Sequence, residues 1–143
     1  MAQVTEHRPT DEELEAAERR GEERMRTDPR AVAARYDADA GRVVIELANG
    51  CTYIFPSEMA QELHGAAADD LAKIEIDGAG FNLHWPRLDA DLYVPAAVAG
   101  VFGTKAWMAK QWARQAGRTT SPAKAAAARA NGAKGGRPRK QAG

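Results

Sequence analysis

The order of apolar and polar positions divides the chain into a central segment with short apolar runs and two strongly polar ends. In the first part of the central segment, β-branched and aromatic residues gather in runs that turn residues separate, which is typical of β-strands. We predict strands over residues 31–36, 42–48 and 51–55. In the first of them, Val32, Ala34 and Tyr36 are expected on one face, because side chains alternate along a strand.

The second half of the central segment mixes apolar runs with glycine, proline and acidic residues. Asn49-Gly50 joins the second and third strands, and this pair favours a type I′ hairpin turn, in which both central residues have positive φ. The following pattern predicts a short helix over 57–64, strands over 71–76 and 81–85, a loop over 86–92 and a short helical stretch over 94–102.

The polar N-terminal segment carries clear signals for one helix after residues 1–9, which we expect to be disordered. Thr10 and Glu13 have the spacing of a capping box, and Asp28-Pro29 ends the helix because the residue before proline disfavours helical geometry. The apolar stripe is thin, so this is a surface helix that is either solvated or in contact with a partner.

The C-terminal segment carries signals for two more helices. We predict the first over 105–116, where Met108 and Trp112 are four residues apart and share a face that would dock on the core or on a second subunit. The second is expected over 122–130, with Ser121 as its N-cap and Asn131-Gly132 as its stop.

These elements predict an α+β fold, with a small antiparallel sheet and short helices. We place the α+β domain at residues 30–103, an acidic N-terminal helical extension at 1–29, and a basic C-terminal extension, part helical and part disordered, at 104–143. No apolar run approaches the length of a membrane span or of a signal peptide, so we expect a cytoplasmic protein with no membrane contact.

Charge is segregated along the chain although the formal net charge is zero. Residues 1–103 contain all 20 acidic residues and 10 basic ones, whereas residues 104–143 contain 10 basic residues and no acid. A basic tail of this kind indicates a polyanionic partner such as nucleic acid. The alternative is a tail that folds back on the acidic part of its own chain.

Residues that could carry chemistry are scattered, and no group of them forms a catalytic or metal-binding motif. His7, His64 and His84 have no ligand spacing, and Cys51 in a strand is expected to be a small buried apolar residue. Asp89 and Asp91 form a carboxylate pair or, more simply, a solvated turn. The sequence therefore predicts no enzyme, no cofactor and no metal.

The end of the tail has the features of a minor-groove binding segment. Residues 136–140, Gly-Arg-Pro-Arg-Lys, resemble the core of an AT-hook, in which an extended backbone carries arginine into the narrow groove of A·T-rich DNA. Gly135 stands where an AT-hook has its upstream arginine, so only Arg137 is placed as an inserting arm. The predicted DNA-binding residues are Lys124, Arg129, Lys134, Gly136, Arg137, Pro138, Arg139 and Lys140. An unstructured basic tail with general affinity for polyanions is the alternative.

The segment from Val43 to Tyr93 resembles a bacterial family, domain of unknown function 2442. The resemblance rests on "VVIELANGCTYIFP" and "LAKIEIDGAGFNLHWPRLDADLYVP". The family marks in these stretches are Gly80, Trp85-Pro86, Asp89, Asp91 and Leu92. It implies a small α+β domain in which Trp85 and Pro86 pack, and it implies no catalytic residue. Family members often neighbour small toxin-like partners, and some carry an added DNA-binding segment, which implies an antitoxin or regulator.

Two functional hypotheses follow for the whole chain. The first is a small bacterial DNA-binding transcription regulator, in its narrower form an antitoxin whose acidic domain holds a small basic toxin-like protein. The second is an adaptor or inhibitor that acts by protein contact through the acidic domain without DNA. A homodimer is compatible with either hypothesis.

Overall fold

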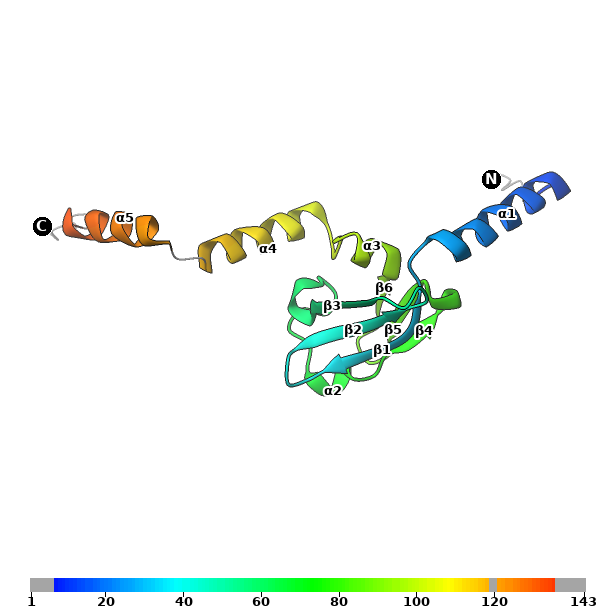
Figure 1. Ribbon diagram of the computed structural model, residues 1–143, viewed down its shortest axis with the longest axis horizontal. Coiled ribbons are helices and arrows are strands. Elements are labelled where there is room, and N and C mark those ends of the chain that lie inside the picture. Colours follow the sequence, from blue (N-terminus) through cyan, green and yellow to red (C-terminus); the bar gives the residue numbers. More distant parts are fainter. Residues whose placement is uncertain (1–6, 119–120, 136–143) are drawn as a thin grey trace, which may run out of the picture. The chain divides into compact units, whose positions relative to one another are not determined.

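The computed structural model describes residues 7–118 and 121–135, and its contacts divide the chain into two units (Figure 1). The first unit, Met1–Thr104, contains helix α1 (Asp11–Thr27) and an α+β domain. The second, Lys105–Gly143, contains helices α4 (Lys105–Arg118) and α5 (Pro122–Ala133). The predicted AT-hook-like residues 136–140 lie outside the described residues.

The α+β domain contains two three-stranded antiparallel sheets. The first sheet has the order β1-β2-β3, formed by Ala31–Asp37, Arg42–Leu47 and Thr52–Pro56. The second has the order β4-β5-β6, formed by Glu75–Asp77, Asn82–Trp85 and Ala90–Tyr93. The helices of the domain are short: α2 (Ala68–Leu71), α3 (Val94–Val98) and a 3-10 turn at Ser57–Met59. The predicted α+β class is therefore confirmed, with two sheets in place of one.

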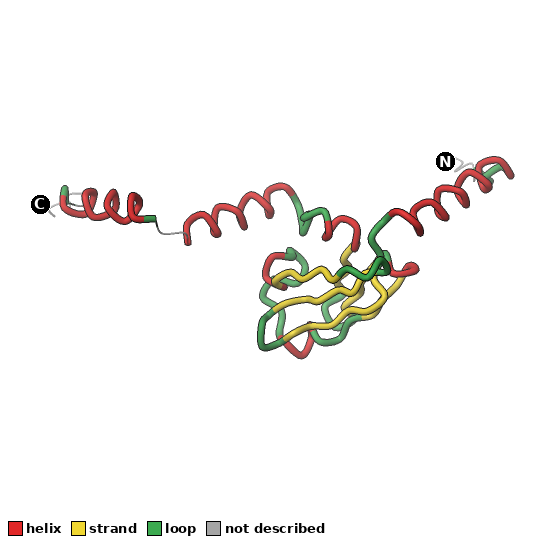
Figure 2. The backbone as a smooth tube through the Cα atoms, in the orientation of Figure 1, coloured by secondary structure: helices red, strands yellow, loops and turns green. Residues whose placement is uncertain are grey.

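A single hydrophobic core joins the two sheets, whose strands lie close together in Figure 2. The first sheet contributes Val43, Ile45 and Phe55, and the second contributes Leu83, Trp85 and Leu92. Trp85 is fully buried, and its indole N–H donates to the carbonyl oxygen of Leu71 at 3.1 Å. This bond satisfies the one polar atom of the largest core side chain, so burying it carries no unmet hydrogen-bond cost.

Helix α1 has the N-terminal cap that the sequence predicts. The Glu13 amide donates to the Thr10 hydroxyl at 3.3 Å, and the Thr10 amide donates to the Glu13 carboxylate at 2.8 Å. The hydrogen bonds that the Thr10 amide and the Thr10 hydroxyl donate to the Glu13 carboxylate lower its pKa, because they favour its charged form. No residue of α1 is buried. Near its end, the Arg24 guanidinium lies over the rings of Phe81 and Tyr93 and donates to the Tyr93 hydroxyl, which holds α1 to the domain.

The hairpin at Asn49-Gly50 forms, but the turn is not type I′. Gly50 has a φ of +87°, whereas Asn49 is not among the residues with positive φ. The Gly50 amide donates to the Leu47 carbonyl at 3.0 Å, and the Asn49 side chain accepts from the Cys51 amide at 2.9 Å. The connection is thus longer, with a single left-handed glycine at its end. Cys51 lies in this turn and is exposed, so the prediction of a buried cysteine is wrong.

Three other local predictions are wrong between residues 57 and 93. The segment 57–64 is a 3-10 turn followed by further turns. Ser57, Ala60 and Leu63 are buried at intervals of three residues, which matches the three-residue repeat of 3-10 geometry. The segment 71–76 is the end of α2 and the start of β4. The expected loop 86–92 contains β6, whose alternation of buried Ala90 and Leu92 with exposed neighbours is only four residues long.

The prediction that Val32 shares a face of β1 with Ala34 and Tyr36 is also wrong. A β-bulge shifts the register between Ala31 and Ala33, so Ala31 is buried and Val32 is 57% exposed. Ala34 and Tyr36 pack against the core as expected. A bulge adds one residue to a strand and therefore reverses the faces on either side of it.

Both C-terminal helices are longer than predicted. Helix α4 continues through Gly117 to Arg118, and α5 continues through Asn131 and Gly132 to Ala133. The left-handed residue that follows α5 is Gly135, with a φ of +80°. Ser121 caps α5 as predicted, since its hydroxyl accepts from the Lys124 amide at 3.1 Å. Asn131-Gly132 therefore does not stop the helix.

Candidate functional site

The basic residues predicted to bind DNA are in part on α5 and in part outside the described residues. Lys124, Arg129 and Lys134 are all exposed, and α5 has no buried residue. Successive members of this set are five residues apart, which turns each by about 140° from the one before. The three cations therefore point in different directions around the axis of α5 instead of forming one face. Gly136, Arg137, Pro138, Arg139 and Lys140 lie outside the described residues.

Helix α4 contains a row of cations that the sequence analysis missed. Lys110, Arg114 and Arg118 are exposed and four residues apart, so their side chains follow one another along one side of the helix. The i, i+4, i+8 spacing of these cations is a signal that the sequence alone contains. Trp112 is 68% exposed in the structure, so it is not the residue by which this helix buries apolar area.

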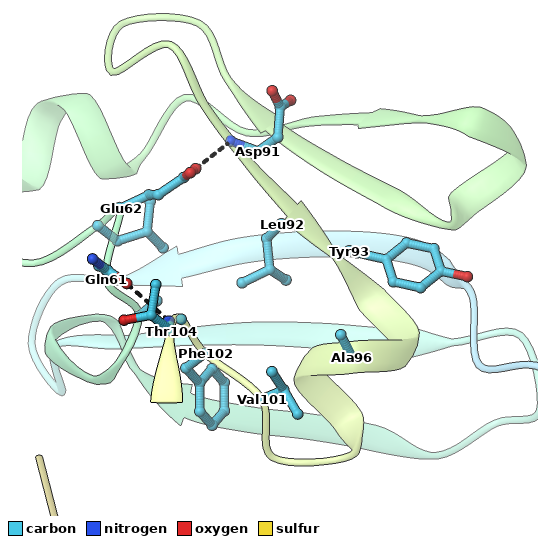
Figure 3. A pocket seen from close by; sticks show the side chains of 12 residues that line it. Gln61, Glu62, Asp91, Leu92, Tyr93, Ala96, Val101, Phe102 and Thr104 are labelled. Carbon is cyan, nitrogen blue, oxygen red and sulfur yellow. Dashed lines mark hydrogen bonds between the residues drawn. The ribbon is translucent and has the colours of Figure 1, made fainter. Parts of the chain in front are cut away.

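The acidic domain has a groove of about 450 Å³ between β6 and the segments around residues 60–63 and 101–104 (Figure 3). Its apolar lining includes Leu92, Ala96, Val101 and Phe102. Two lining residues have acidic side chains, Glu62 and Asp91, and no lining residue is basic. The groove is thus an apolar channel with an acidic rim.

Hydrogen bonds between main chain and side chains fix the walls of this groove. The Asp91 amide donates to the Glu62 carboxylate at 3.1 Å, and the Thr104 amide donates to the Gln61 side-chain oxygen at 3.0 Å (Figure 3). The Gln61 amide donates to the Phe102 carbonyl at 2.9 Å. These bonds therefore hold the segment around Gln61 against residues 102–104 at the end of the domain.

A second polar cluster lies on the neighbouring strand. His84 Nδ1 and the Asp91 carboxylate are 2.8 Å apart, across the β5–β6 pair. The hydrogen bond to Asp91 raises the pKa of His84, and the negative charges of Asp91, Glu75 and Asp89 act in the same direction, against the effect of burial. Asp89 has a φ of +46° and lies in the turn before β6, whereas Asp91 lies in the strand and contacts His84.

Within residues 7–118 and 121–135, no three His, Cys, Asp or Glu side chains come together as a group that could hold a metal ion. His64 contacts the Glu58 carboxylate at 2.8 Å, and His7 contacts that of Glu13 at 3.4 Å, far apart along the chain. In the same described part, no helix has the length and apolar character needed to cross a membrane.

The model of the family named "Protein of unknown function (DUF2442)" matches residues 31–103 of the chain, about half of its length. The protein belongs to the DUF2442 family. The match begins at β1 and ends just before α4, so it covers the α+β domain and the groove. Hereafter residues 31–103 are called the DUF2442 domain. A comparison with curated proteins gives no match.

Two solved structures are similar to the chain. One is the crystal structure of a protein of unknown function from Rhodospirillum rubrum, with 54% identity and a TM-score of 0.55, over 57% of this chain and 99% of that one. The other is the solution structure of an uncharacterized protein from Chromobacterium violaceum, with 28% identity and a TM-score of 0.58, over 73% of this chain and 96% of that one. Both likenesses support the fold of the α+β domain.

The residues on which the family resemblance rested have structural roles in the DUF2442 domain. Gly80 has a φ of +94°, and a β-carbon there would lie 2.3 Å from the carbonyl oxygen of Ala31. Trp85 and Leu92 are core residues. Pro86, for which the resemblance implied a packing role, is exposed, because it follows the buried end of β5 into a surface turn.

Proposed function

We propose that the protein is a small bacterial DNA-binding regulator that contacts DNA through its C-terminal unit. The supporting observation is that, over the described residues 105–135, seven basic side chains are all exposed and no acidic residue accompanies them. The set is Lys105, Lys110, Arg114, Arg118, Lys124, Arg129 and Lys134. Phosphate contacts by such residues supply most of the affinity of non-specific DNA binding, and their loss has a measurable salt signature. Such a regulator would act in the cytoplasm.

The proposal has a finer part, in which the segment around Arg137 acts as an AT-hook-like arm. Arg137 would enter the minor groove of A·T-rich DNA, while Arg139, Lys140 and the helical cations contact phosphates. An antitoxin role, with a small basic protein held by the acidic domain, is the narrower form of the same proposal.

Fluorescence anisotropy of the full chain with A·T-rich and G·C-rich duplexes at several salt concentrations tests this function. Arg114→Gln should lower the salt slope by about 0.9 on both duplexes, as expected for one lost phosphate contact. Arg35→Gln is the matched control, because it removes the same charge from an exposed residue of β1 and should leave the slope unchanged. Arg137→Ala should reduce the preference for A·T-rich DNA, whereas Arg139→Ala should weaken both duplexes alike.

The results can reject either level of the proposal. Equal effects of Arg137→Ala and Arg139→Ala on both duplexes would leave a general basic tail and remove the AT-hook-like arm. No binding to either duplex at low salt would remove the DNA-binding function itself.

A second candidate function is protein binding by the acidic domain without DNA. The observation that favours it is the groove beside β6, which combines an apolar lining with an acidic rim. The DUF2442 domain, residues 31–103, has 11 acidic and four basic residues, so its charge favours a basic partner. Mixing experiments with the product of a neighbouring gene would test this function directly.

A further inference from the structure

Strand β6 is an edge strand whose outer side faces the groove. It pairs with β5 on one side, and the order of its sheet places it at the end. The Val94 amide donates to the Phe81 carbonyl at 2.8 Å, so amides at even positions point toward β5. Because main-chain groups alternate along a strand, the amides of Asp91 and Tyr93 point to the outer side.

Glu62 covers part of this outer edge. Its carboxylate accepts from the Asp91 amide at 3.1 Å and so occupies the position where the carbonyl of an added strand would accept (Figure 3). A charged side chain placed against an edge strand is a common way to prevent unspecific strand pairing. Unlike a paired strand, a glutamate side chain can rotate away.

The two faces of β6, on which successive side chains alternate, offer different chemistry to an added strand. Leu92 is buried and lies with Val101 and Phe102 in the apolar lining, and Val101 is 53% exposed. The side chain of Asp91 is exposed on the opposite face of the strand, near Glu62. A segment that fits both faces therefore alternates apolar and basic residues, because its side chains also alternate between the two faces.

We propose that the outer edge of β6 binds an extended, cationic segment of a partner protein, which pairs with β6 as a further strand. Its apolar side chains lie over Leu92 and Val101, and its lysine or arginine side chains pair with Asp91 and Glu62. The Tyr93 amide donates to the added strand. This inference rests on the second proposed function, protein binding by the acidic domain, and it does not depend on DNA binding.

The experiment is a titration of the isotope-labelled full chain with two blocked peptides, followed by NMR. The first probe is a six-residue peptide of alternating lysine and valine, and the second has glutamate at each lysine position. The lysine peptide should shift the amide signals of Asp91, Tyr93 and Gln61, and it should slow hydrogen exchange at Tyr93, because a new main-chain bond forms there. The glutamate peptide should bind at least about tenfold more weakly, since like charges face each other.

Matched variants separate the groove from general acidity. Glu62→Gln should weaken lysine-peptide binding about two- to fivefold, the usual size for an exposed ion pair. Glu46→Gln removes the same charge from an exposed position on β2 and should change nothing. Val101→Glu should weaken binding by roughly tenfold or more, by placing a charge on the apolar lining. Its control is Ile54→Glu on β3, where Ile54 is 49% exposed.

Four outcomes would overturn the proposal. Equal effects of Glu62→Gln and Glu46→Gln would show general charge attraction, and equal binding of the two peptides would show that the acidic rim selects nothing. Shifts confined to another surface, such as the outer edge of β3, would reject the groove and keep protein binding by the domain. No shift with either peptide at millimolar concentration would reject this site, whereas protein binding by the domain is tested separately by mixing with the product of a neighbouring gene.

Discussion

Two tryptophans, Trp85 in the DUF2442 domain and Trp112 in α4, lie in opposite surroundings. Trp85 is 0% exposed and hydrogen-bonded to the carbonyl of Leu71, whereas Trp112 is 68% exposed. The residues around Trp85 come from both sheets, so its burial holds distant parts of the chain together.

The contrast extends to the whole of the two units. The buried apolar side chains of the described residues belong to residues 31–97, and the one buried residue of α4 is Gln111. Helix α5 has none. The DUF2442 domain is thus stabilised by its own core, while α4 and α5 depend on caps and helix propensity, which are weak for short helices in water. Such helices gain most from a partner, which agrees with the proposed contact to DNA.

The largest expected effect on stability is the difference between alanine substitutions at two glycines, one in each unit. Gly80→Ala should strongly destabilise the DUF2442 domain, because φ is +94° and the new methyl group would meet the main-chain oxygen of Ala31 at 2.3 Å. Left-handed geometry alone costs about 1–3 kcal/mol for other residues, and displacement of β1 adds to this cost. Denaturant unfolding followed by tryptophan fluorescence measures the change.

Gly132→Ala is the matched control in α5. A β-carbon there meets nothing within 4 Å, so the helix should gain about 0.5–1 kcal/mol. A domain that tolerates Gly80→Ala without loss would show that the approach of Ala31 to this turn is not needed for folding.

The next effect concerns the two tryptophans. Trp85→Ala should lower the free energy of unfolding by about 3–5 kcal/mol, the range for removing a large buried aromatic side chain. Trp112→Ala should change it by less than about 0.5 kcal/mol, as usual for exposed positions. Circular dichroism during urea unfolding measures both. Comparable losses for the two variants would mean that α4 contributes to the folding of the DUF2442 domain.

The sequence predicted the part of the fold that local signals determine. The capping box at Thr10 and Glu13, strands β1 to β3 and the α5 N-cap at Ser121 follow from residues within a few positions of one another. Strand β6 and the turns after Ser57 were not predicted. Their apolar positions are too few to indicate an element, and these segments are fixed by the burial of Leu63 and Leu92 in the core. The groove could not be predicted at all, since Glu62 and the Asp91 amide are 29 residues apart.

A smaller effect tests the caps on which the C-terminal unit depends. Ser121→Ala removes the hydroxyl that accepts from the Lys124 amide and should destabilise α5 by about 1 kcal/mol. Far-ultraviolet circular dichroism should show reduced helix content, while the unfolding midpoint of the DUF2442 domain stays unchanged. Ser121→Asp is the control that keeps a capping acceptor. A shifted midpoint in Ser121→Ala would contradict the independence of the two units.

The smallest effect uses pH to separate the units, because the C-terminal unit, 105–143, contains no histidine. The Asp91 hydrogen bond raises the pKa of His84 above its usual 6.5, so the protonated form is favoured in the folded state. The stabilisation is therefore fully present below 6.5 and is lost as pH rises through the higher folded-state pKa. NMR titration of the His84 ring should show this pKa, and Asp91→Asn should bring it closer to 6.5, because the largest cause of the shift is gone.

The same titration affects the groove. Below its pKa, protonated His84 shares the charge of Asp91, and above it the Asp91 carboxylate is fully available at the rim. Binding of the lysine–valine peptide should therefore tighten as pH rises through the pKa of His84, and this step should be absent in His84→Gln. DNA binding by the C-terminal unit should show no step in this range, since lysine and arginine stay protonated there. A His84-dependent step in DNA affinity would contradict this expectation, because it would show that the DUF2442 domain takes part in DNA binding.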